Sequence, residues 1–344
     1  MIDWVDFTAP FVHDVGPGTP FYAGEVMATK PTGELDWGVY KRMELEGSHS
    51  AKIQIRSSTM SDGRQAIRVS GNLVKWFQGH NIFGTNDLPG LVLEGLAKIM
   101  DLGGITPNDI EVASWHRGDI ELLRVDVTES ASFGNRERVL NALRSLDATA
   151  NLKFRGRGQF NGHSLLFGKG SRNWSLTLYS KGAELQKHKL PLSLNAEPLH
   201  AAADGLLRIE FRMLSMHLKR LGIDTVEAWG DNTASEVHHS HLEKLQISDT
   251  TMLDSDKLEG LPSRLQAAYQ LWKDGHDLRV MFPRPTFYRY RSQLLAHGVD
   301  ISVKQDRETN NIVPLRVVLV GKPFSVPDWA VNSPYYFEPR YRAI

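Results

Sequence analysis

Three short segments of the sequence alternate apolar and polar residues, and this pattern constrains the fold most. The segments are residues 119–128, 174–181 and 206–214. Side chains alternate across a β-strand, so residues two apart share a face. Each segment therefore predicts a strand that turns an apolar face to a core and a polar face outward. If the three strands are neighbours in one sheet, their polar faces form one surface that carries Arg124, Asp126, Tyr179, Lys181, Arg208, Glu210 and Arg212.

The rest of the chain predicts further strands and several helices. Strand-like pieces occupy the N-terminal part, and apolar residues recur at helical spacing over 88–101 and 135–147. This mixture predicts an α+β fold in which residues 1–229 form an antiparallel-sheet domain. We expect an acidic linker at 230–260 and a smaller, mainly helical C-terminal domain at 261–344.

The predicted C-terminal domain contains a run of cations and aromatic residues at 284–291. Proteins that bind single strands combine these two kinds of side chain. Phe287, Tyr290 and Leu294 also recur at helical spacing, as core residues do. The run therefore leaves a DNA-binding role and a packing role equally open.

Composition excludes several classes of protein. The 344 residues are 41% hydrophobic and 23% charged, as in ordinary globular proteins. There is no cysteine, which excludes disulfides, zinc fingers, iron–sulfur ligation and a thiol nucleophile. No apolar run approaches the roughly 18 residues of a membrane span, and the N-terminus is acidic where a signal peptide is basic. We therefore expect a cytoplasmic protein without a membrane partner.

The formal net charge is zero, but the charges are unevenly placed. Residues 151–190 hold eight basic residues and one acidic residue, whereas 231–260 hold seven acidic residues and two lysines. A basic, glycine-rich segment suits a phosphate backbone, although a solvated loop has the same composition. Its candidate DNA ligands are Lys153, Arg155, Arg157, Lys169 and Arg172.

The predicted polar surface has the groups needed to cleave a phosphodiester. Asp126 and Glu210 lie on different strands, and two such carboxylates could hold Mg²⁺ or Mn²⁺ through oxygen ligands. Such a cation polarises a phosphoryl oxygen. A tyrosine is a poor nucleophile at its free pKa of about 10, so Tyr179 would need a nearby cation, Lys181 or the metal, to favour the phenolate.

The three arginines of this surface allow two interpretations. The planar forks of Arg124, Arg208 and Arg212 could clamp phosphates of bound DNA. They could equally orient the acids in a structural ladder of ion pairs. Asp3 and Asp6 lie on the first predicted strand, where the alternation does not decide which of them faces the site.

Longer motifs resemble a known family. Residues 78–88 read Gln-Gly-His-Asn-Ile-Phe-Gly-Thr-Asn-Asp-Leu and resemble a run in the gene II replication initiator of filamentous phages. Shorter matches follow in the same order, so the resemblance to these gene II and gene X type initiators spans nearly the whole chain. These matches are at residues 124–126, 179–186, 207–212, 310–315 and 327–329.

This resemblance implies a rolling-circle replication initiator. Such an enzyme nicks one strand at the phage origin, stays attached to the 5′ phosphate through a tyrosine, and later joins the displaced strand into a circle. The matching tyrosine is Tyr179. The family implies as partners origin DNA, single-stranded and supercoiled double-stranded, with the host helicase and polymerase, in the bacterial cytoplasm.

The metal site is less well defined by the resemblance. Similarity to plasmid initiators implies Asp126 and Glu210 as ligands, with Glu184 as a third. The nuclease signature of two histidines flanking one apolar residue is absent, and the nearest string, at 238–241, is expected to be exposed. His80 could contact DNA or transfer protons, or it could have a structural role. Two other functions stay open: a noncatalytic origin-binding regulator, and a metal nuclease in which water attacks.

Overall fold

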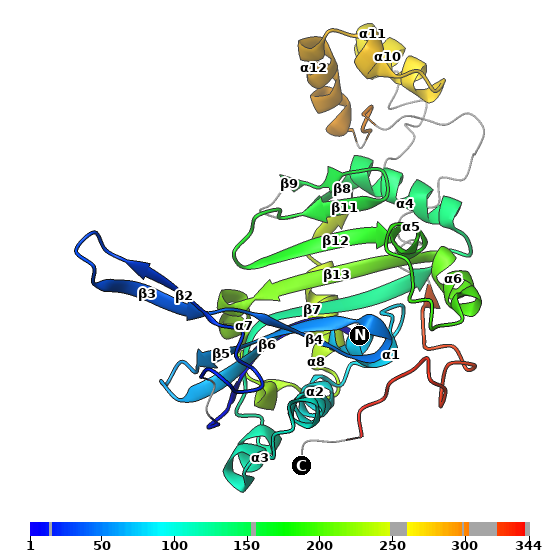
Figure 1. Cartoon of the computed structure of the whole chain (residues 1–344). Coiled ribbons are helices and arrows are strands. Elements are labelled where there is room, and N and C mark those ends of the chain that lie inside the picture. Colours follow the sequence, from blue (N-terminus) through cyan, green and yellow to red (C-terminus); the bar gives the residue numbers. More distant parts are fainter. Residues whose placement is uncertain (14–15, 153–155, 248–259, 298, 303–321, 341–344) are drawn as a thin grey trace.

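The computed structural model describes residues 1–13, 16–152, 156–247, 260–297, 299–302 and 322–340 (Figure 1). A ten-stranded sheet forms its centre, and every neighbouring pair in it is antiparallel. Nine strands form the path, in the order β10 (Gln159–Phe160), β11 (Ser164–Phe167), β12 (Trp174–Ser180), β13 (Leu206–Leu214), β7 (Glu121–Ser132), β1 (Ile2–Pro10), β6 (Gln65–Gly71), β5 (Lys52–Thr59) and β4 (Met43–Glu46). The tenth strand, β15 (Lys322–Pro323), pairs with β7.

The three alternating segments form neighbouring strands of this sheet, as expected. Thr177 of β12 lies opposite Glu210 of β13, which lies opposite Thr128 of β7. Tyr179 lies opposite Arg208. The antiparallel α+β architecture predicted from the sequence is therefore confirmed, and the register places the polar side chains of the three strands on one face.

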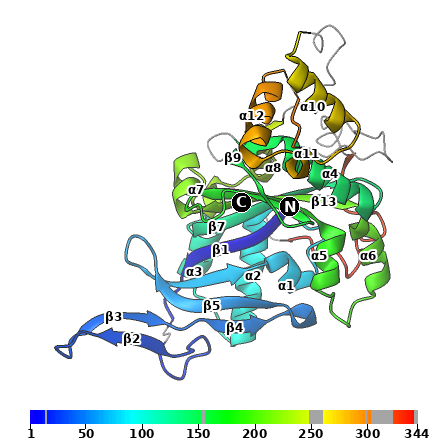
Figure 2. The same cartoon turned by 90° about the horizontal axis from the view of Figure 1, so that it is seen from above.

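Helices cover the apolar face of the sheet. Figure 2 shows α4 (Arg136–Thr149), α7 (Ser215–Leu221) and α8 (Thr233–Leu242) on that side. Their apolar residues join the strand residues in one large core. On the other half of the sheet, α1 (Leu73–Gln78) and α3 (Asp109–His116) contact β1, and α2 (Leu88–Gly103) contacts α1.

Local sequence signals explain where α2 begins and ends. The Asp87 side chain accepts a hydrogen bond from the Gly90 backbone N–H, which caps the helix, and Pro89 fits the first turn. Gly104 ends the helix in the left-handed conformation that glycine adopts readily. This helix confirms the expectation for residues 88–101.

The expectation of an acidic linker beginning at residue 230 is wrong for the part that the structure describes. Residues Thr233–Leu242 form α8, and Leu245–Ile247 form β14 in a small sheet with β8 (Ala150–Leu152) and β9 (Gly156–Arg157). His238 and His241, expected to be exposed, are buried against Phe211. The helix is acidic only on its outer face, so a charge count could not reveal that its inner face belongs to the core. Residues 248–259 lie outside the described residues.

The C-terminal part divides into two pieces rather than forming one domain from 261 to 344. The helices α10 (Ser263–Lys273), α11 (Leu278–Met281) and α12 (Arg284–Leu295) have their own core, which confirms the predicted helical unit. Phe287 and Leu294 are buried in that core, as the packing interpretation expects. Residues 324–340 instead pack on the sheet domain, where Phe337 stacks on Phe77 with ring centroids 4.0 Å apart. We call residues 322–340 the C-terminal strap.

Other elements extend the sheet domain. The hairpin of β2 (Glu25–Thr29) and β3 (Leu35–Tyr40) projects away from the main sheet (Figures 1 and 2). Two helices, α5 (Lys181–Lys187) and α6 (Ala196–Asp204), connect β12 to β13, and two short turns of 3₁₀-helix occur at Ser48–Ser50 and Val226–Ala228. No helix in the described part of the chain is long and apolar enough to cross a bilayer.

Candidate active site

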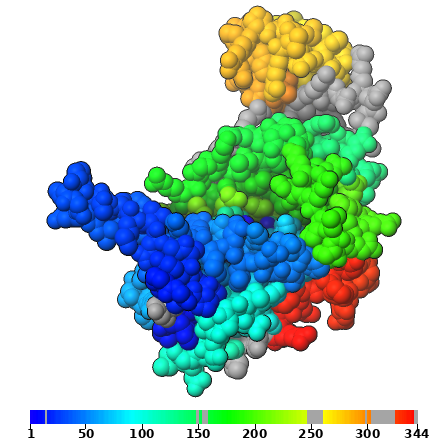
Figure 3. Space-filling model, in the orientation of Figure 1, coloured from blue at the N-terminus to red at the C-terminus, as the bar shows by residue number. Residues whose placement is uncertain are grey.

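The polar face of β12, β13 and β7 is the candidate active site. The space-filling view shows this face as a recess between the green surface of the β11–β12 side and the blue surface of the N-terminal strands (Figure 3). Tyr179 and Glu210 lie on the same face, because their strands pair with Tyr179 opposite Arg208 and Thr177 opposite Glu210. The phenol and the carboxylate therefore lie on one side of the sheet, as the proposed chemistry requires.

Glu210 is the acid with the least compensation in the site. Its side chain is 13% exposed, and the Nη2 of Arg212 lies 3.7 Å from its Oε1. Burial raises the pKa of Glu210 to about 8, and the negative charges of Asp3 and Asp126 add to the shift. The positive charges of Arg212 and Arg208 oppose it only in part. Glu210 therefore carries a proton at neutral pH unless a further positive charge is supplied.

Asp126 is held by two arginines. Its side chain is only 2% exposed. The Nε of Arg124 donates to its Oδ1 at 2.8 Å, a second Arg124 nitrogen bonds to its Oδ2, and the Nε of Arg212 lies 3.4 Å from Oδ2. Burial nevertheless raises the pKa of Asp126. This arrangement matches the ion-pair ladder for Arg124 and Arg212, although Arg212 is still 45% exposed and accessible to a ligand.

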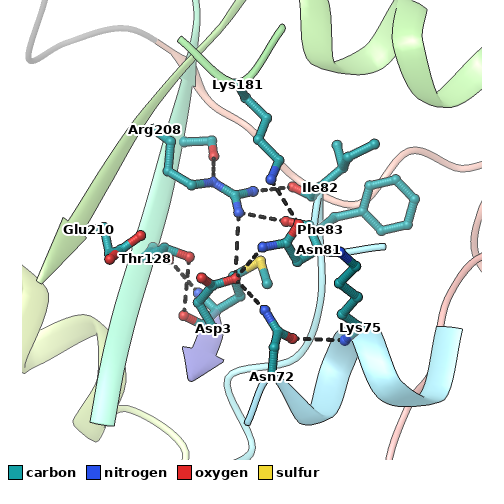
Figure 4. Close-up of polar contacts among 12 residues, drawn as sticks. Asp3, Asn72, Lys75, Asn81, Ile82, Phe83, Thr128, Lys181, Arg208 and Glu210 are labelled. Carbon is teal, nitrogen blue, oxygen red and sulfur yellow. Dashed lines mark hydrogen bonds and ion pairs between the residues drawn. The ribbon is translucent and has the colours of Figure 1, made fainter. Parts of the chain in front are cut away.

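Asp3 joins the site, and sequence alternation could not show this. Its Oδ1 accepts hydrogen bonds from Asn81 Nδ2 at 2.8 Å and Asn72 Nδ2 at 3.0 Å, as Figure 4 shows. Among the acids, Asp3 contributes most to the raised pKa of Glu210. The other candidate on the first strand, Asp6, is paired with Arg68 through bonds of 2.8 and 2.7 Å.

Arg208 was expected to clamp a DNA phosphate, and its burial contradicts this. Its side chain is fully buried. The guanidinium donates to the backbone carbonyls of Asn81 and Ile82 and lies 3.2 Å from Ser130 Oγ (Figure 4). Arg208 therefore fixes the loop of the 78–88 motif, and its charge acts on the site from below the surface.

Lys181 also serves this loop. It is the first residue of α5, and its buried Nζ bonds to Asn81 Oδ1 at 2.8 Å and pairs with Glu184 Oε2 at 2.6 Å. Burial lowers the pKa of Lys181 to about 8. Glu184, expected as a third metal ligand, is thus already paired with a cation.

Tyr179 is protonated in this arrangement. Burial raises its pKa well above 10, and the charges of Glu210 and Asp3 raise it further. The cation that favours its phenolate is Arg208, whereas Lys181 was expected in that role. Attack by this tyrosine therefore needs a group that accepts its proton or additional positive charge beside the scissile phosphate.

The carboxylates fit a divalent cation only in part. Among the described residues, no group of three or more His, Asp or Glu side chains is placed to hold a metal ion. However, Glu210 and Asp126 both have raised pKa values from burial and mutual repulsion. Such buried acids are offset by a hard cation with oxygen ligands. The protein thus offers a partial set of donors, and substrate oxygens and water would have to supply the rest.

His80 has the structural role that was one of its two interpretations. It is buried, its Nε2 lies 2.9 Å from the Tyr335 carbonyl of the C-terminal strap, and burial lowers its pKa to about 4. Gln78 Nε2 donates to the Phe83 carbonyl at 2.8 Å and closes the same loop. The long motif therefore serves mainly to present Asn81 to Asp3 and Lys181.

The basic segment stays separate from these groups. Lys169 and Arg172 are exposed in the turn before β12, at the opposite end of that strand from Tyr179. Lys153 and Arg155 lie outside the described residues, and for Arg157 only the backbone, in β9, is described. Their predicted contact with DNA stays a prediction.

Comparison with known proteins identifies the family. Residues 1–232 match the N-terminal family model of the replication-associated protein of phage gene II, and residues 253–336 match the C-terminal family model of the same protein. The chain is 33% identical over 337 residues to the replication-associated protein of Enterobacteria phage I2-2, covering 95% of each protein. It is 25% identical to that of Enterobacteria phage M13, covering 78% of this chain and 77% of the relative.

A solved rolling-circle replication initiator from Geobacillus stearothermophilus gives a weaker similarity. It is 13% identical, covers 89% of this chain and 98% of the other, and has a TM-score of 0.33, too low to relate the two folds. The family models and the phage relatives, by contrast, extend over most of the sequence and include every part of the candidate active site. The chain therefore belongs to the gene II family of phage replication-associated proteins, as the motifs at 78–88 and 179–186 indicated.

Proposed function

We propose that this protein is a rolling-circle initiator that cuts one strand of phage origin DNA and rejoins it through Tyr179. The observation that carries the proposal is the common face of Tyr179, Glu210 and Asp126 on neighbouring strands. Membership in the gene II family supports a role in phage replication. The recess over this face supports access for DNA (Figure 3).

In the proposed cleavage step, the Tyr179 oxygen attacks the phosphorus of the scissile phosphodiester. The new bond joins phosphorus to the phenolic oxygen, and the bond to the 3′ oxygen breaks. The phenolic proton passes to a carboxylate of the site, and the departing 3′ oxygen gains a proton to become a hydroxyl. The products are a 5′-phosphotyrosine and a free 3′ end, which the host polymerase and helicase would use.

The protein's own groups have distinct parts in this step. Arg208 supplies the buried positive charge that favours the phenolate. The exposed guanidinium of Arg212 is placed to neutralise charge on the phosphate. Mg²⁺ or Mn²⁺, held by Glu210 and Asp126 with Asp3 nearby, would polarise the phosphoryl oxygens. Joining is the reverse displacement, in which a 3′ hydroxyl attacks the phosphotyrosine.

The substitution Tyr179→Phe tests the nucleophile, because it removes only the hydroxyl. We expect nicking of supercoiled origin DNA with Mg²⁺ to fall at least about a thousandfold, with no protein left on the 5′ end after denaturation. Binding of origin DNA should stay within about twofold. Tyr22→Phe, at the base of the projecting hairpin, is the matched control and should nick normally.

Two outcomes would select another function. Normal nicking by Tyr179→Phe without a covalent adduct would favour a metal nuclease in which water attacks. Absence of nicking by the unchanged protein, with origin binding intact, would favour a noncatalytic regulator. Mapping the crosslinked peptide by mass would show directly whether residue 179 carries the DNA.

A further inference from the structure

A groove next to the candidate active site has no part in the chemistry above. Its volume is about 720 Å³, within the range of about 300–1,000 Å³ that ligand pockets have. Its walls come from three parts of the chain: β1, the segment from β5 to α1, and the loop between α5 and α6. The residues that matter for its chemistry are Trp4, Lys52, Asn72, Lys75, Lys189 and Ser193.

The charge of this groove favours an anion. Three lysines line it, and the described lining includes no acidic side chain. Lys52 is paired with Glu44 at 2.9 Å. Lys75 and Lys189, in contrast, form no ion pair with any described residue. A row of lysines along a groove is typical of proteins that follow a phosphate backbone.

Trp4 adds a surface on which a base can stack. It lies opposite Asp126 in the sheet register and lines the groove. The Arg124 guanidinium lies 4.8 Å from the centroid of the Trp4 ring. The indole Nε1 of Trp4 is buried without a hydrogen-bond partner among the described residues. An unpaired buried donor is costly, and an oxygen of a bound nucleotide would satisfy it.

The groove leads directly to the acids. Asn72 lines the groove and donates from Nδ2 to Asp3 Oδ1 at 3.0 Å (Figure 4). On the opposite wall, Ser193 Oγ lies 2.7 Å from the Nδ1 of His49, so the loop between α5 and α6 is linked to the turn before β5. A strand lying along the lysines would therefore reach Asp3 and Glu210 at the end of the groove.

We propose that this groove holds the single strand of DNA that is to be cut, with its phosphates on Lys75, Lys189 and Lys52 and one base stacked on Trp4. This inference rests on the proposed function for the meaning of the site, but not for its test. A single strand is favoured over a duplex, because an aromatic platform contacts only a base that is unstacked from its neighbours.

The test measures binding of a fluorescent oligothymidylate of about 12 nucleotides to the full chain without metal, so that no cleavage occurs. Lys75→Gln and Lys189→Gln should each weaken binding severalfold and reduce the slope of log affinity against log salt by about 0.7. Lys219→Gln, an exposed lysine of α7 on the opposite side of the sheet, is the matched control and should change neither quantity.

Stacking is tested separately. Trp4→Leu should weaken binding of the oligothymidylate about tenfold. An abasic strand of equal length should bind more weakly than the oligothymidylate and should not distinguish Trp4→Leu from the unchanged protein. If Trp4→Leu does not fold, the two lysine variants still decide the matter.

The outcomes separate this inference from the proposed function. Unchanged affinity and salt slope in both lysine variants would overturn the groove, even if Tyr179→Phe abolishes nicking. Equal weakening for a duplex of the same length would overturn the assignment to a single strand. Weakened binding in the lysine variants would support the groove, even if Tyr179→Phe nicks normally and the proposed nucleophile is wrong.

Discussion

At the scale of single residues, the site depends on charges that are buried without full compensation. Glu210 lies near Asp3 and Asp126, and its nearest cation is the Arg212 guanidinium at 3.7 Å. A carboxyl in this position is stable as the neutral acid, or as the anion when a cation binds. The mutual repulsion of these acids thereby favours a divalent cation.

Glu210→Gln should remove a pH dependence of stability. The pKa of Glu210 is about 8 in the folded protein, against an ordinary value of 4.5, so folding takes up a proton between these values. Its contribution to stability is therefore present below pH 4.5 and lost as the pH rises through 8. We expect the metal-free protein to lose up to about 1.4 kcal/mol of unfolding free energy per pH unit in this window.

Urea unfolding at several pH values measures this effect. The profile of Glu210→Gln should be flatter than that of the unchanged protein, whereas Glu227→Gln, an exposed acid, should leave it unchanged. Added Mg²⁺ should stabilise the unchanged protein more at high pH, because binding displaces the proton. Identical profiles in all three proteins would contradict the assignment of a raised pKa to Glu210.

At the scale of elements, α8 shows how a charged segment can complete a core. His238 and His241 are buried, and burial lowers the pKa of each to about 4. The Nε2 atoms of His241 and His217 are 2.8 Å apart, which requires that at most one of them carries a proton. Glu236 and His239 of the same helix are exposed. The helix is therefore fixed by neutral imidazoles on its inner face.

This helix should make the protein sensitive to acid. The buried histidines have lowered pKa values, so the unfolded chain takes up protons first as the pH falls below 6.5. Their contribution to stability is present above pH 6.5 and is lost towards pH 4, by up to about 1.4 kcal/mol per pH unit for each histidine. Thermal melts of His241→Gln should show a smaller loss of midpoint in this window. His239→Gln should melt like the unchanged protein, and a flattened profile in that control would argue against burial as the cause.

At the scale of the whole molecule, the sheet domain is completed by segments far along the chain. Its core includes α8, and the C-terminal strap returns to pair with β7 and to contact the 78–88 loop. Phe337 N–H donates to Gln78 Oε1 at 2.8 Å. The strap and the 78–88 loop therefore form one structure, so a cut between predicted domains would disturb the site.

Two truncated chains test this organisation. A chain ending at residue 229 lacks α8 and exposes Phe211 and Trp174, so we expect it to unfold without a cooperative transition. A chain ending at residue 247 keeps α8 but lacks the strap, so it should fold with a lower thermal midpoint than the full chain. Circular dichroism during heating distinguishes them. A cooperative transition in the shorter chain equal to that in the longer one would contradict the role of α8.

The sequence by itself determined the strands, their two faces and the family. The alternation in β12 and β13 is local, because each residue's side is fixed by its neighbours in the strand. Tyr179, Glu210 and Asp126 could therefore be placed on one polar face before any coordinates, and the motif at 78–88 indicated the family correctly. The choice of Tyr179 as nucleophile stays a prediction.

Only the tertiary structure decided which polar groups meet and which are buried. Asp3 reaches the site because the pairing of β1 with β7 shifts register between Ile2 and Trp4, so strict alternation fails there. Arg208 and Lys181 bind Asn81, which lies 127 and 100 residues away in the chain, and are buried by that contact. Periodicity reports the side of a strand on which a residue lies, but burial depends on what folds over that side.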